Sequence, residues 1–94
     1  MPKINIYNRS GIGVVLQTGK TTAAGKWSGD PTKTSLKANG SKVVTVSGPV
    51  GVTAAPVGAP EHSGNWRGTP TGELNLYIVA SANSLQISLH DPDL

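Results

Sequence analysis

Residues 73–90 read ELNLYIVASANSLQISLH, and this stretch decides the fold class. In its first half, three apolar side chains alternate with three others: Leu74, Leu76 and Ile78 against Asn75, Tyr77 and Val79. A period of two is typical of a β-strand with one buried face. Turn formers follow at residues 82–84, and a second alternation over 84–90 places Leu85, Ile87 and Leu89 inward. The stretch therefore predicts a β-hairpin.

Further strands are expected upstream of this hairpin. Alternation or β-branched residues predict strands over residues 3–8 (KINIYN), 13–18 (GVVLQT), 33–36 (KTSL) and 42–47 (KVVTVS), with a turn at Asn39-Gly40. We expect residues 19–31 to form a loop or a short irregular strand. Residues 50–55 (VGVTAA) are expected to pair only at a sheet edge, because the nearby prolines lack the N–H group that a central strand needs.

The predicted strands have one apolar face each, and a second layer must cover that face. No segment shows a helical period, so the second layer must itself be a sheet. The sequence predicts an all-β fold, a small antiparallel β-sandwich of about six strands, with residues 1–94 as a single domain.

Composition excludes several classes of protein. The chain has no Cys, so disulfides and thiolate metal sites are excluded. Its net charge is +3, but no basic cluster adjoins the tyrosines, and we do not expect nucleic-acid binding. The opening MPKINIYNRSG lacks the apolar segment of a secretory signal. We expect a protein made in the cytoplasm, with later release or action on external membranes left open.

Motifs for catalysis or metal binding are weak. The sequence GKTT at residues 19–22 resembles the end of a phosphate-binding loop, but Val14 stands where that motif requires Gly. The acidic stretch HDPD at residues 90–93 offers too few ligands for a metal, and Asp91-Pro92 fits a turn. No base adjoins a nucleophile in a recognisable motif. We therefore expect no enzyme activity, no metal and no cofactor.

The two tryptophans are the strongest candidates for ligand contacts. Trp27 follows Lys26, and Trp66 lies between Asn65 and Arg67 in a segment rich in glycine. The sequence leaves open whether Trp27 plugs the end of the core or is displayed. The glycines around Trp66 favour a loop that displays this side chain, as an anchor at a membrane interface or over a sugar ring.

Several segments, taken in order, resemble the aegerolysin family and the related actinoporin-like sandwich. They are INIYNRSG (residues 4–11), VVLQ (14–17), GKWSGDP (25–31), GTPTGELNLYI (68–78) and LQISLHDP (85–92). Trp27 falls on the family's Gly-x-Trp position, and Tyr77 falls on the tyrosine after its Gly-Thr turn. Trp66 has no firm counterpart, and residues 48–64 look like an insertion.

The resemblance implies a β-sandwich that binds a membrane lipid headgroup of the sphingolipid type. It also implies a component of a pore-forming or insecticidal toxin, with a larger perforin-like protein as partner. Family members continue beyond the Asp-Pro point, so a face would be left uncovered here, and we expect a homo-oligomer. Two alternatives stay open, namely a lectin-like sandwich that stacks a glycan on its loop tryptophans and a structural interaction module.

Overall fold

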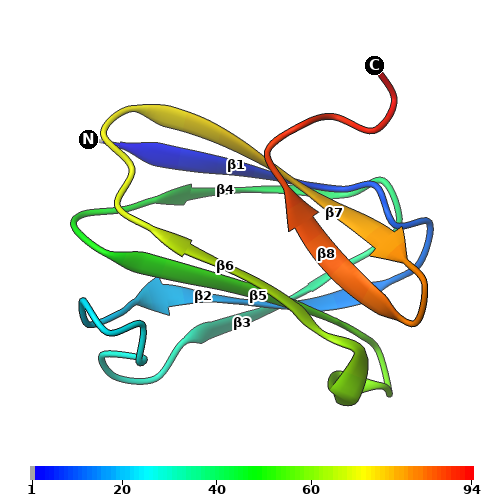
Figure 1. The fold of residues 1–94 in the computed structure, drawn as a ribbon, viewed down its shortest axis with the longest axis horizontal. Helices are drawn as coiled ribbons and strands as arrows, with labels where there is room; N and C mark the ends of the chain where they lie inside the picture. The colour runs from blue at the N-terminus through cyan, green and yellow to red at the C-terminus, as the bar shows by residue number, and fades with distance from the viewer. Residues whose placement is uncertain (1) are drawn as a thin grey trace.

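A computed structural model describes residues 2–94 and shows two four-stranded β-sheets packed face to face (Figure 1). The elements are β1 (Lys3–Asn8), β2 (Val14–Lys20), β3 (Thr32–Leu36), β4 (Ser41–Thr45), β5 (Val50–Pro56), the 3-10 turn η1 (Pro60–His62), β6 (Gly64–Gly68), β7 (Glu73–Ser81) and β8 (Ser84–Ser88). One sheet has the order β4-β1-β7-β8 and the other β3-β2-β5-β6. The predicted all-β sandwich is confirmed, with eight strands rather than about six.

The core lies between the sheets and is built from the inward positions of each strand. Ile4, Ile6, Leu76 and Ile78 are fully buried on one sheet, and Val14, Leu16 and Ala54 are fully buried on the other. The alternation of the sequence therefore marks the buried face correctly. Leu89 is an exception, because β8 ends at Ser88 and the Leu89 side chain is 55% exposed.

The strands β1 and β7 pair in parallel, whereas every other strand pair is antiparallel. Their sequences KINIYN and ELNLYI align in register, so that Asn5 lies beside Asn75 and Tyr7 beside Tyr77. The Asn5 amide donates a hydrogen bond to the Asn75 side-chain oxygen at 2.9 Å, and the two tyrosine rings stack with centroids 5.3 Å apart. Like residues thus form matched pairs on the outer face of the sheet.

The edge-strand prediction for residues 50–55 is wrong. They belong to β5, which lies between β2 and β6 in the centre of its sheet. Pro49 precedes the strand and Pro56 is its last residue, so neither proline removes an N–H group from the middle of the ladder. The segment that looked like an insertion is therefore part of the central framework.

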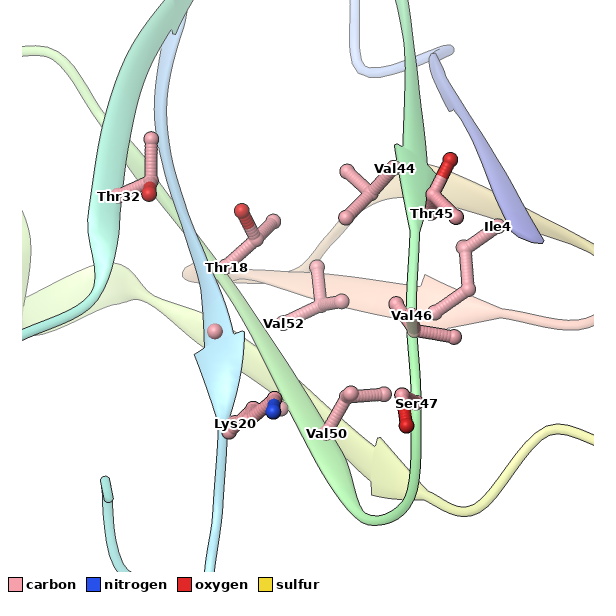
Figure 2. A pocket seen from close by; sticks show the side chains of 12 residues that line it. Ile4, Thr18, Lys20, Thr32, Val44, Thr45, Val46, Ser47, Val50 and Val52 are labelled. Atoms are coloured by element: carbon pink, nitrogen blue, oxygen red, sulfur yellow. The ribbon is translucent and has the colours of Figure 1, made fainter. Parts of the chain in front are cut away.

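The sandwich is closed on one side only. Where β6 meets β8, Gly64 lies so close to the Leu85 backbone that a Cβ atom at Gly64 would collide with the Leu85 carbonyl oxygen. On the opposite side, the edge strands β3 and β4 flank a cleft between the sheets (Figure 2). Within residues 2–94, no helix is long and apolar enough to cross a membrane.

Candidate functional site

The loop between β2 and β3 folds back on itself over the outer face of their sheet. Thr21 and Trp27 form an isolated antiparallel bridge, and the Thr22 N–H donates to the Lys26 carbonyl at 2.7 Å. The turn between them needs Gly25, whose φ of +87° lies in the left-handed region that favours glycine. These bonds hold Trp27 at a fixed point over the outer face of the β3-β2-β5-β6 sheet.

Two glycines on that outer face make room for the indole of Trp27. A Cβ atom at Gly51 would lie 3.3 Å from Cζ3 of Trp27, and one at Gly19 would lie 3.6 Å from the same atom. The far edge of the six-membered ring therefore rests on β5 and β2, and 37% of the side chain stays exposed. Trp27 does not plug the end of the core. It covers the outside of the sheet.

Arg67 joins this loop to β6. Its Nη1 donates a hydrogen bond to the Ala24 carbonyl at 2.8 Å, and the guanidinium occupies the space beside Gly25 that a Cβ atom would take. Asn65 lies two residues earlier on the same outward face, beside Thr53 of β5. The strand thus presents two polar side chains toward the loop that carries Trp27.

Trp27, Asn65, Arg67, Gly51 and Thr53 border one pocket of about 310 Å³, which we call the Trp27 pocket. No carboxylate lines this pocket, whereas Arg67 provides a positive charge. Lys26, which directly precedes Trp27 in the loop, has an exposed side chain. The pocket therefore combines a half-exposed aromatic ring with fixed hydrogen-bonding groups and positive charge. This combination suits a polar, uncharged or anionic ligand.

The interpretation of Trp66 as a displayed loop residue is wrong. Residues 64–68 form β6, and Trp66 lies opposite Val52 on the inward face of that strand. Its side chain is half-buried and packs against the core. The polar-apolar-polar order of Asn65, Trp66 and Arg67 is the strand alternation, but the flanking glycines obscured it.

Tyr77 lies on the other sheet and takes no part in the Trp27 pocket. It stacks on Tyr7, and the Arg9 guanidinium carbon lies 5.4 Å from the centre of the Tyr7 ring. The Nε atom of Arg9 is 3.4 Å from an Asp93 oxygen and 3.7 Å from an Asp91 oxygen, but it makes no hydrogen bond. The C-terminal acidic stretch is therefore drawn toward Arg9.

The predicted site residues thus separate into three groups. Trp27, Asn65 and Arg67 come together with Lys26 nearby. Trp66 borders the same pocket from β6, but its side chain packs against the core, and Tyr77 is on the opposite sheet. Gly19, Gly51 and Thr53 also shape this site, and none of them was predicted from the sequence. A glycine inside a strand pattern, as in VGVT, is a signal of close approach by another group and would have found Gly51. Among residues 2–94, no three His, Asp or Glu side chains gather where they could hold a metal.

Comparison with known proteins supports the fold alone. No protein-family model matches the chain, and no curated protein matches it. Among solved structures, it is similar to a protein from Eubacterium rectale determined by NMR, with a TM-score of 0.61 and 12% sequence identity. The likeness covers 99% of this chain and 91% of that chain, so the whole small two-sheet β-sandwich is shared.

Proposed function

We propose that this protein binds a glycan, free or as the headgroup of a membrane lipid, in the Trp27 pocket. The observation that carries the proposal is the convergence of Trp27, Asn65 and Arg67 on one pocket. An indole provides a broad apolar surface for the C–H groups of a sugar ring, and amide and guanidinium groups bond its hydroxyls. Small-molecule sites commonly combine apolar area with a few placed polar groups in this way.

The pocket is held in shape before any ligand arrives. Arg67 is fixed by its bond to the Ala24 carbonyl, and the indole rests on two glycines. A ligand therefore does not have to order these side chains, which lowers the entropy lost on binding. Such a site favours recognition of one headgroup over general adhesion.

Recognition of a headgroup fits the exposed area better than insertion into a bilayer does. Only 37% of the Trp27 side chain is exposed. For a side chain of about 250 Å², that exposed part corresponds to about 2–3 kcal/mol of transfer free energy. This is too little to anchor a protein on a membrane. The aegerolysin resemblance implies a sphingolipid ligand. Within that class we propose lipids with a sugar headgroup.

The test is a glycan array followed by vesicle binding with matched variants. Vesicles of phosphatidylcholine with galactosylceramide, with sphingomyelin, or with neither separate the sugar from the phosphocholine headgroup. We expect binding to a glycan and to the glycolipid vesicles, weakened at least about tenfold in Trp27→Ala and in Arg67→Gln. Tyr77→Phe, on the other sheet, is the control and should bind normally.

Three results would contradict the proposal. Binding to sphingomyelin vesicles without any glycan binding would favour a phosphocholine site. Glycan binding that survives Trp27→Ala would place the site elsewhere on the surface. Failure to bind any glycan or vesicle would favour the structural interaction module.

A further inference from the structure

A cleft of about 320 Å³ lies between the two sheets on the side away from β6 and β8, and we call it the inter-sheet cleft (Figure 2). Its apolar wall comes from β1, from β5, and from β4 with the residue that follows it. The wall consists of Ile4, Val44, Val46, Val50 and Val52. Its rim is polar and includes Thr18, Thr32, Thr45 and Ser47. Lys20 lies at the end of this rim, at the mouth of the cleft.

The cleft exists because small side chains occupy inward positions on β2 and β3. The inward series of β2 is Val14, Leu16, Thr18 and Lys20, so its apolar character ends halfway along the strand. Thr32 of the edge strand β3 pairs with Thr18 and adds no apolar bulk. The chain has no Phe, and neither tryptophan lines this space. Val44 of the facing sheet is half-buried and borders the open part of the cleft, whereas Ile4, Val46, Val50 and Val52 are buried and form its floor.

Lys20 gives the cleft one charge. The residue occupies the same face of β2 as Leu16 and lies opposite Val50 in register. None of the ion pairs within residues 2–94 involves Lys20, and no carboxylate lines the cleft. An ammonium group at the mouth of an apolar space is complementary to a ligand with an anionic head and an apolar tail.

We propose that the inter-sheet cleft binds a fatty acid, with its alkyl chain along Val44 and over the buried floor formed by Val50 and Val52, and its carboxylate beside Lys20. The volume of about 320 Å³ is at the lower end of the range for small-molecule sites, which fits one alkyl chain and excludes a two-chain lipid. The site is separate from the Trp27 pocket, because the two lie on opposite faces of β2 and β5. Fatty-acid binding in the cleft therefore does not depend on glycan binding in the Trp27 pocket.

The test is an NMR titration of the labelled protein with dodecanoate below its micelle concentration. We expect the largest shifts at the methyl groups of Val44, Val50 and Val52. Hexanoate, with a shorter tail, should bind more weakly, and dodecyltrimethylammonium, with a cationic head, should bind at least about tenfold more weakly. Lys20→Gln should weaken dodecanoate binding by a similar factor. Lys33→Gln, on the outer face of β3, is the matched control and should not.

A second variant tests the cleft itself. Thr32 is exposed at the start of β3, so Thr32→Phe should fold and place a ring across the opening. We expect this variant to lose dodecanoate binding and to keep glycan binding. The proposal is overturned if shifts map outside the cleft, if the cationic amphiphile binds equally well, if Thr32→Phe binds dodecanoate normally, or if no binding occurs at millimolar dodecanoate.

Discussion

Gly51 shows how one missing side chain builds the candidate site. The residue is buried near the start of β5, yet its outer face is where the indole of Trp27 rests. Thr21 approaches the same point from the loop, and a Cβ atom at Gly51 would lie 2.9 Å from its Cγ2. The loop and the sheet can meet only because this position is a glycine.

We expect Gly51→Ala to displace Trp27 and to weaken glycan binding, because the added methyl group occupies the space of the indole edge. The two-dimensional NMR signal of the indole N–H reports the displacement, and calorimetry reports the affinity. Gly72→Ala is the control, since a Cβ there meets nothing within 4 Å. Unchanged indole signals in Gly51→Ala would show that the indole of Trp27 does not rest on Gly51.

Asn8 is a fully buried polar residue whose side chain links two turns. Its amide nitrogen lies 2.8 Å from the Ile12 carbonyl and 3.1 Å from the Lys37 carbonyl, and its oxygen accepts from the Ser10 hydroxyl at 2.6 Å. Asn8→Ala leaves these groups without partners, so we expect the free energy of unfolding to fall by about 2–3 kcal/mol. Urea denaturation measures it. Asn65→Ala, at an exposed position, should leave stability within about 0.5 kcal/mol.

At the scale of elements, strands whose side chains alternate without interruption could be predicted from the sequence, whereas strands that contain or adjoin glycine and proline could not. The hairpin of β7 and β8 was predicted because six apolar positions keep one period, and only its last residue, Leu89, leaves the pattern. The central strand β5 was assigned to an edge because its flanking prolines looked like interruptions. The prolines do not interrupt the hydrogen bonds of β5 because they lie before its first residue and at its last, and only the structure shows these bounds.

The candidate site was predicted in part for the same reason. Six residues were selected for their chemistry. Trp27, Asn65, Trp66 and Arg67 line one pocket, whereas Lys26 lies beside it and Tyr77 is on the other sheet. No sequence pattern brings residues 27 and 67 to one pocket, because Arg67 reaches the loop of Trp27 only when β5 lies between β2 and β6. The orientation of Trp66 follows from the strand assignment of residues 64–68, which the sequence analysis treated as a loop.

The strand assignment of β6 predicts opposite behaviour for the two tryptophans. Trp66→Ala removes a half-buried side chain that packs on the core, so we expect a loss of about 2 kcal/mol in unfolding free energy with glycan affinity kept. Trp27→Ala should lower affinity with little loss of stability. Parallel urea curves and glycan titrations of both variants check this. If Trp66→Ala lowers glycan affinity without loss of stability and Trp27→Ala does the opposite, Trp66 is a displayed residue and the prediction is wrong.

At the scale of the whole molecule, homo-oligomer formation stays a prediction. The uncovered face that suggested it is absent from residues 2–94, because each four-stranded sheet covers the inner face of the other. What remains is the edge strand β4, where Val43 is 60% exposed on the outer face. If a second copy covers this edge, Val43→Lys should shift sedimentation equilibrium toward the monomer. A mass of 9.6 kDa at all concentrations would contradict the prediction.

The parallel pairing of β1 with β7 also sets the order in which the molecule can assemble. Asn5 and Asn75 are bonded across a separation of 70 residues, whereas the β3-β2-β5-β6 sheet uses only residues 14–68. Contacts that close such long loops form slowly. During synthesis, β1 must therefore wait for β7 to leave the ribosome, and the apolar face of the first-formed sheet stays exposed until then. The sandwich therefore closes only when the last hairpin of the chain is available.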